Sequence, residues 1–110
     1  MSADACVVFY GVRYDLGREE IPGLEARSDA RIAAARRAGL KYYWANFSSP
    51  GERYLLFIGS ELAILGPENT LELSLSSDAL HNVMQSTKEK LLAANLAGEP
   101  SLFLQWQADI

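Results

Sequence analysis

The stretch YYWANF, residues 42–47, decides how the rest of the chain is interpreted. Four of its six residues are aromatic, and successive side chains of an extended strand point to opposite faces of a sheet. Both faces of such a strand therefore carry rings. We expect one face to form the core, so the stretch raises the question of what covers the other face.

The residues that follow, 48–65, predict two further strands joined by tight turns. Pro50 and Gly51 fit the centre of a type II turn, and Gly59 with Ser60 fits a two-residue hairpin turn. Pairing the strands about these turns places Tyr43 opposite Ile58 on one face. The pairing also predicts the composition of both faces. The Tyr43 face contains Tyr43, Phe47, Tyr54, Leu56, Ile58 and Leu65, and the opposite Trp44 face contains Trp44, Leu55, Phe57, Leu62 and Ile64.

Patterns elsewhere in the chain predict two helices and further strands. A first strand is expected over residues 5–14 and a long surface connection over 15–27. A first helix is expected over 29–38, with Ser28 as its N-cap and Gly39 as its stop. A second helix from residue 77 or 78 that ends before Gly98 and a last strand over 101–108 complete the order, and residues 71–75 fit a further short strand or an extended edge.

This order, β-α-β-β-β-α-β, predicts a single α+β domain over residues 1–110. The nearest simple architecture is a ferredoxin-like antiparallel sheet with two helices on one face. Because the sequence offers no third helix, we expect the Tyr43 face to lack a cover. In element order alone, the plan is similar to that of dimeric α+β barrels, in which two ferredoxin-like subunits press their sheets together and sometimes enclose a ligand or a cofactor-independent active site.

An uncovered apolar face of this size is typical of an interaction site. A homodimer would cover it with one patch used twice, a different protein could bind there, and a small molecule could lie against the rings. We therefore expect a non-enzymatic interaction module, and the alternative is a small-molecule binder or a cofactor-independent enzyme of the dimeric barrel type. The candidate partner-binding or ligand-binding residues are Tyr43, Phe47, Tyr54, Leu56 and Ile58, together with Arg13 and Arg36 as a possible anion-binding margin.

Charge and motifs exclude several classes of function. The net charge of -4 and the pI of about 4.9 argue against nucleic acid or an anionic membrane as the main partner. No apolar run reaches the roughly 18 residues of a membrane span, and no secretory signal is visible, so a cytoplasmic protein is expected. A lone histidine, His81, and a lone cysteine, Cys6, make no metal or nucleophile motif, and no cofactor is expected. Basic residues cluster over 27–41, which would suit an acidic partner.

Overall fold

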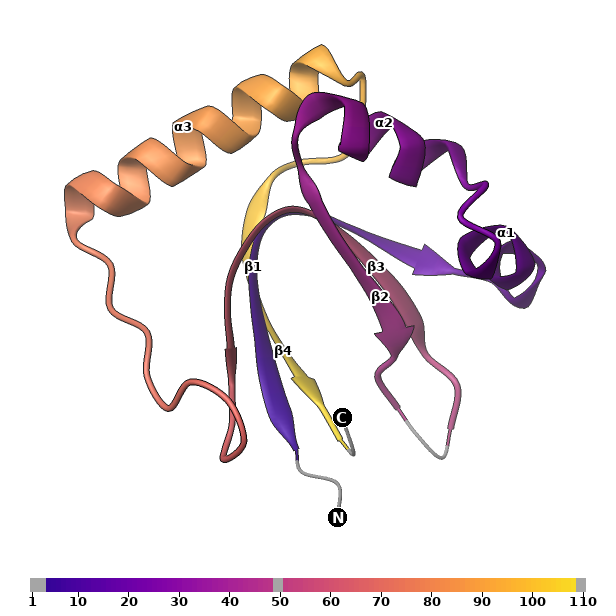
Figure 1. Ribbon diagram of the computed structural model, residues 1–110, viewed down its shortest axis with the longest axis horizontal. Coiled ribbons are helices and arrows are strands. Elements are labelled where there is room, and N and C mark those ends of the chain that lie inside the picture. Colours follow the sequence, from indigo (N-terminus) through magenta and orange to yellow (C-terminus); the bar gives the residue numbers. More distant parts are fainter. Residues whose placement is uncertain (1–3, 49–50, 109–110) are drawn as a thin grey trace.

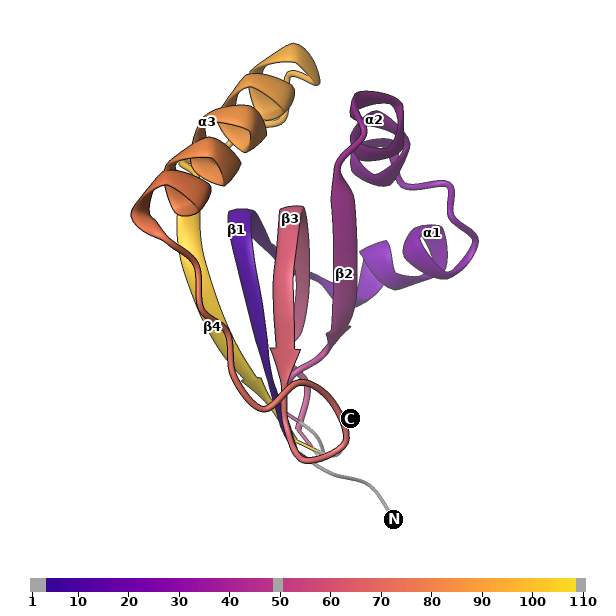
Figure 2. The ribbon, with the colours of Figure 1, turned by 60° about the vertical axis from the view of Figure 1, so that its left-hand side comes forward.

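The computed structural model describes residues 4–48 and 51–108. In these residues the chain is α+β, with one four-stranded antiparallel sheet of order β2-β3-β1-β4. Helices α2 and α3 lie over the same side of this sheet (Figure 1, Figure 2). The strands are β1 (Ala5–Leu16), β2 (Lys41–Asn46), β3 (Tyr54–Leu65) and β4 (Ser101–Gln107), and the helices are α1 (Ile21–Glu25), α2 (Ala30–Ala38) and α3 (Ser77–Ala93).

The two longer helices begin and end close to where the sequence predicts. The carboxylate of Asp29 caps α2 by accepting a hydrogen bond from the Arg31 backbone N–H, and Gly39 ends the helix at a φ of 76°. Such a left-handed stop favours glycine because an added Cβ would be strained there. The prediction of Ser28 as the cap is wrong, because its hydroxyl donates instead to the Gly23 carbonyl.

The connection between β1 and α2 is more ordered than the sequence predicts. It contains a 3-10 turn (Arg18–Glu20) and α1, and Leu24 of α1 is buried in the core between helices and sheet. Arg31 joins this connection to α2, because its guanidinium lies 2.8 Å from both Glu20 and Asp29. The expected surface loop is therefore part of the packed structure.

The predicted hairpin turn at Gly59 and Ser60 is wrong, because β3 runs through both residues as one strand. Gly59 pairs with Gly11 midway along the long β1-β3 ladder. A Cβ added to Gly11 would overlap the Ile58 carbonyl oxygen, and one added to Gly59 would overlap the carbonyl oxygen of Tyr10. The glycines thus permit a close approach of β1 and β3, two strands that both arch strongly (Figure 1).

The predicted register of β2 against β3 is wrong by one residue. Tyr43 lies opposite Phe57, and Trp44 lies opposite Leu56. Asn46 accounts for the shift, because its side chain accepts hydrogen bonds from Ser48 N and Arg53 N and donates to Gly51 O. A one-residue shift exchanges the faces of a strand. The turn predicted at Pro50 and Gly51 includes Pro50, which lies outside the described residues.

The predicted strand over 71–75 is not present. An isolated bridge joins Leu65 to Thr70, and the chain then continues without strand pairing to Ser76, which caps α3. This segment lies alongside the sheet on the same side as α3 (Figure 1). It matters for function because it forms one wall of the site described below.

The sheet has an apolar core on each face. Side chains from all three helices pack against Val12, Leu56 and Ile58 on the helix side. The other face is concave, and there the ring centroid of Phe57 lies 5.6–5.7 Å from those of Phe9, Phe47 and Phe103. The curvature of the sheet buries these rings without a second layer, since Phe9 and Phe57 are 0% exposed.

No helix in the described part of the chain has the length and apolar content that a membrane crossing requires.

Candidate functional site

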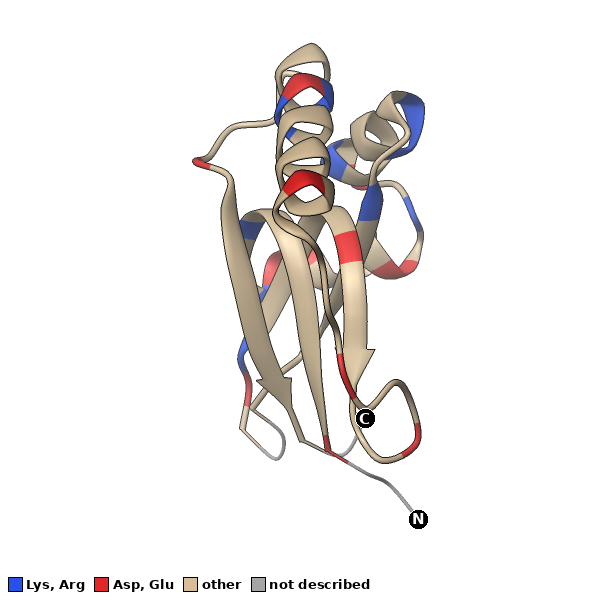
Figure 3. Ribbon diagram, turned by 90° about the vertical axis from the view of Figure 1, so that its left-hand side faces the viewer, with Lys and Arg blue, Asp and Glu red and all other residues tan. Residues whose placement is uncertain are grey.

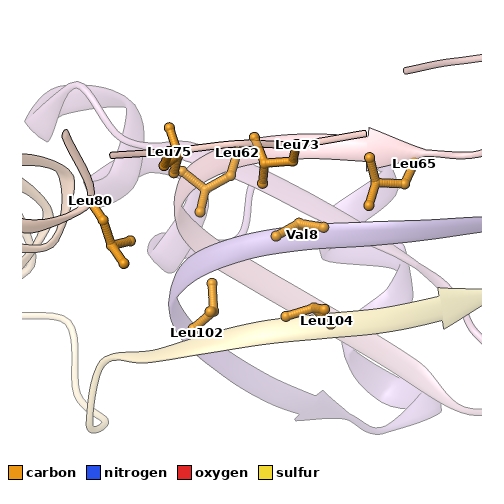
Figure 4. Close-up of a pocket in the computed structure, with 8 residues that line it drawn as sticks. All are labelled: Val8, Leu62, Leu65, Leu73, Leu75, Leu80, Leu102 and Leu104. Atoms are coloured by element: carbon orange, nitrogen blue, oxygen red, sulfur yellow. The ribbon is translucent and has the colours of Figure 1, made fainter. Parts of the chain in front are cut away.

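Four exposed leucines, Leu73, Leu75, Leu102 and Leu104, gather on the helix side of the sheet, beyond the region that α3 covers. They surround an open groove of about 240 Å³. All of its lining side chains are aliphatic (Figure 4). We call it the leucine groove, and it is lined by Val8, Leu62, Leu65, Leu73, Leu75, Leu80, Leu102 and Leu104.

Five parts of the chain line the leucine groove, and one of them is β3, which supplies Leu62 and Leu65. Leu73 and Leu75 come from the unpaired segment before α3, and their spacing of two places both on one side of an extended chain. Leu102 and Leu104 come from β4, and Val8 of β1 lies between the two walls (Figure 4). Leu80, from the first turns of α3, closes one end of the groove.

Strand β4 extends this apolar surface to the edge of the sheet. Leu102, Leu104 and Trp106 alternate along it and are 49%, 63% and 57% exposed. The intervening Phe103 packs in the concave core, so the exposed side of the strand is the one that carries Leu102, Leu104 and Trp106. The leucine groove together with Trp106 is called the leucine surface below.

Burial of this surface would stabilise a complex. Its most exposed members, which include Leu73 and Leu75 at 37% each, leave on the order of 500 Å² of apolar area in water, near the upper end of the largest patch on a typical monomer. At about 25 cal/mol per Å², the gross gain from covering it is roughly 10 kcal/mol before the costs of association.

The aromatic and aliphatic site residues predicted from the sequence do not lie together. Tyr43 and Phe47 are on the concave face, with ring centroids 6.1 Å apart. Leu56 and Ile58 are on the opposite face, fully buried beneath the helices. Tyr54 is half-buried at the start of β3, opposite Asn46. The five residues therefore do not form one exposed face, because of the one-residue shift in register.

The two predicted arginines also lie apart. Arg13 is on the concave side, where its guanidinium lies 4.8 Å from the centroid of the Phe103 ring and donates to Gln105 Oε1 at 3.2 Å. Arg36 is exposed on α2, on the other side of the sheet, and borders a shallow hollow with Arg37. They form no common anion site, and neither borders the leucine groove.

The hydroxyl of Tyr43 has a shifted pKa, and its role is in the fold. Burial raises the pKa of the Tyr43 hydroxyl above its ordinary value of 10.0, while its hydrogen bond to Gln107 opposes the rise and the charge of Glu61 adds to it. Tyr43 therefore stays neutral and donates to Gln107 Oε1 at 2.7 Å. Across the residues that the structure describes, no cluster of three histidine, cysteine or acidic side chains could hold a metal.

Sequence reasoning missed the leucine surface, although two signals for it were present. The alternating segments LELSL (71–75) and LFLQW (102–106) each repeat a large apolar residue at every second position. Alternation predicts that one side of each segment is apolar. It does not predict which apolar sides remain uncovered, because this depends on where α3 crosses the sheet.

Comparisons with protein-family models, with curated proteins and with solved structures find no match to this chain.

Proposed function

We propose that this protein is a non-enzymatic interaction module that forms a homodimer through the leucine surface. The observation that supports this most strongly is an aliphatic groove continuous with the exposed apolar side of an edge strand. A contiguous apolar patch near the upper end of the range found on monomers is often functional. A twofold dimer would cover two copies of the patch with one contact.

The proposal differs from the sequence-based hypothesis in where the interface lies. The rings of Phe47 and Phe57 already contact each other on the concave face, and Phe47 is only 6% exposed. A partner would gain little by covering side chains that are already dry. The uncovered apolar area is on the helix side, so we assign the interface to that side.

We also propose that the fold follows the ferredoxin-like plan, with α1 as an addition to the first crossover. The sheet order β2-β3-β1-β4 and the antiparallel pairing of every neighbouring pair support this. In that plan β1 and β3 are the central strands and β2 and β4 are the edges. The plan therefore makes β4 available to a partner.

A second candidate function is the binding of a small apolar molecule, such as an acyl chain, in the leucine groove. The groove volume of about 240 Å³ and its aliphatic lining favour this candidate. It predicts that a fluorescent fatty acid binds to the protein at one site per chain and that Leu75→Asp abolishes the binding. Absence of saturable binding would leave the dimer as the function of this surface.

The solution mass across a concentration series, by light scattering after size exclusion, tests the proposed function. We expect about 24 kDa for the wild type, twice the chain mass of 12.1 kDa. Leu104→Asp should give a folded monomer, because a buried unpaired carboxylate is costly in an interface. A wild type that remains a monomer up to high micromolar concentration would contradict the proposal.

Leu92→Asp provides the matched control for this experiment. Leu92 is 81% exposed on α3 and does not line the leucine groove. The substitution therefore adds the same charge to a leucine that is more exposed than Leu104 and lies elsewhere. We expect this variant to dimerise as the wild type does, and circular dichroism should show the same fold for all three proteins.

A further inference from the structure

We propose that the contact between the two copies is made by β4, which pairs antiparallel to β4 of the second copy across a twofold axis that passes between the two Leu104 residues. This inference rests on the proposed function and specifies the geometry of the dimer. Two four-stranded sheets would join into one continuous sheet. The two leucine grooves would then lie on the same side of that sheet, on either side of the axis.

The first observation that supports this pairing is the free edge of β4. Strand β4 pairs only with β1 and forms one end of the sheet, so the outer N–H and C=O groups have no strand partner in the described part of the chain. Figure 3 shows the strand at this edge with no charged residue along it. An edge strand of this kind readily pairs with a further strand.

The charge of the two edges supports the choice of β4. Natural proteins protect exposed edges with charged residues, lysine above all. Strand β2, the other edge, begins with Lys41, and Arg53 and Glu52 lie just before its partner strand β3. From Pro100 to Ala108 the chain has no charged residue. Two copies of β4 can therefore approach each other without like charges in contact.

The spacing of the exposed side chains supports a second copy as the partner. With the axis at Leu104, each Leu102 lies opposite Trp106 of the other copy and the two Leu104 side chains are neighbours. All three exposed side chains then make apolar cross-strand pairs. A shift of one residue would place residues from opposite faces in register, which the pleat forbids. A shift of two would leave either Leu102 or Trp106 without a large apolar partner.

Edge pairing would bury the side chains and the outer main chain of β4, but not the whole leucine surface. It would cover Leu102, Leu104 and Trp106, which are 49%, 63% and 57% exposed, and would leave Leu73 and Leu75 uncovered. The ladder of backbone hydrogen bonds would satisfy the edge groups and fix the register.

Disulfide cross-linking of single-cysteine variants tests the pairing. Every variant has Cys6→Ser, so that the introduced cysteine is the only thiol in the chain. Leu104→Cys should give one disulfide-linked dimer, because directly opposed residues have Cα atoms about 4.5–5.5 Å apart, within disulfide range. Leu102→Cys alone should not link, because two copies of residue 102 would be about 13 Å apart along the strands.

A mixture of two single-cysteine variants tests the same register by cross-linking without a substitution at Leu104. Leu102→Cys mixed with Trp106→Cys should give a heterodimer, although neither variant links to itself. Leu73→Cys serves as a control, because it lines the leucine groove away from β4. Cross-linking of the mixed pair with no product from Leu73→Cys would support the pairing.

The outcomes separate this inference from the proposed function. A wild-type dimer in light scattering, with no cross-linking at residue 104 and none in the mixed pair, would overturn the β4 pairing and leave the proposed function in place. A wild type that is monomeric at every concentration would overturn both.

Discussion

The hydroxyl of Tyr43 donates a hydrogen bond of 2.7 Å to Oε1 of Gln107, and these residues belong to strands at opposite edges of the sheet. Residues that are three strands apart can meet only if the sheet curves strongly. The rings of Phe47, Phe57 and Phe103 lie on the same concave face. The aromatic side of β2 is therefore covered by the sheet itself, which answers the question that residues 42–47 raise.

Tyr43→Phe should destabilise the fold by about 1–2 kcal/mol, because it leaves the Gln107 acceptor unpaired where that residue is 8% exposed. Urea unfolding of Tyr43→Phe, Gln107→Leu and the double variant would measure the coupling energy. We expect the double variant to lose less unfolding free energy than the two single variants lose in sum.

Tyr42→Phe is the matched control for the Tyr43 variant. Tyr42 is the neighbouring tyrosine of β2, and it packs on the helix side. Its hydroxyl makes no side-chain hydrogen bond that the described residues contain. Removing this hydroxyl should change the free energy of unfolding by less than about 0.5 kcal/mol. An equal loss of unfolding free energy in Tyr42→Phe and Tyr43→Phe would contradict the claim that the Tyr43 hydroxyl joins the two edges of the curved sheet.

Gly11→Ala and Gly59→Ala should each destabilise the protein by about 3 kcal/mol or more, because the new methyl group would overlap backbone that cannot move without breaking the ladder. Thermal unfolding monitored by circular dichroism provides the measurement. Gly23→Ala is the control, since its new methyl group would lie 3.7 Å from the nearest atom, the Ser28 hydroxyl. Tolerance of alanine at both paired glycines would show that the close approach of β1 and β3 is absent.

The ion pair at the start of α2 predicts a pH dependence. Hydrogen bonds from Arg31 hold the pKa of Asp29 below its usual 3.8, against the opposing effect of burial. The folded state thus binds this proton less readily than the unfolded state does. The contribution of Asp29 is present above about pH 4 and is lost as the pH falls through the lower folded pKa.

Asp29→Asn should therefore lower the free energy of unfolding by about 1 kcal/mol at pH 7. The difference in unfolding free energy between this variant and the wild type should be smaller near pH 2.5. Urea unfolding at both pH values gives the comparison. Asp15→Asn is the control, because Asp15 is exposed and forms no ion pair among the residues that the structure describes. A difference for Asp29→Asn that stays constant with pH would exclude a role for the Asp29 charge.

Salt should have little effect on the dimer, because the leucine surface has no charged member. Each chain has a net charge of -4, so screening of the mutual repulsion should leave the dissociation constant unchanged or slightly lower it between 50 and 500 mM NaCl, a range over which the Debye length falls from about 14 to 4 Å. Sedimentation equilibrium can measure this constant. Marked weakening by salt would indicate an ionic interface, for which the basic residues of α2 are the candidates.

Local signals predicted most of the secondary structure correctly. Gly39 ends α2 as predicted, because a helix end of this kind requires a backbone angle that glycine adopts easily, whereas the N-caps are Asp29 and Ser76, each within two residues of the predicted start. The α+β class followed from the order of these elements. Each of these inferences depends on residues that are close together in the sequence.

Features that depend on distant residues were not predictable. Gly59 with Ser60 has the composition of a hairpin turn, and only the pairing of Gly59 with Gly11 shows that it allows two strands to approach. Hydrogen bonds from the Asn46 side chain across its loop shift the register by one residue. The exposure of Leu104 follows from the path of α3, which no local pattern specifies.

Hydrogen exchange measured by mass spectrometry, at protein concentrations below and above dimerisation, tests the central claim most directly. We predict that amides of residues 101–107 become protected in the dimer and that amides of 41–47 do not change. This result would assign the interface to β4 and the leucine surface. Protection confined to 41–47 would contradict the account, because it would assign the interface to the aromatic strand instead.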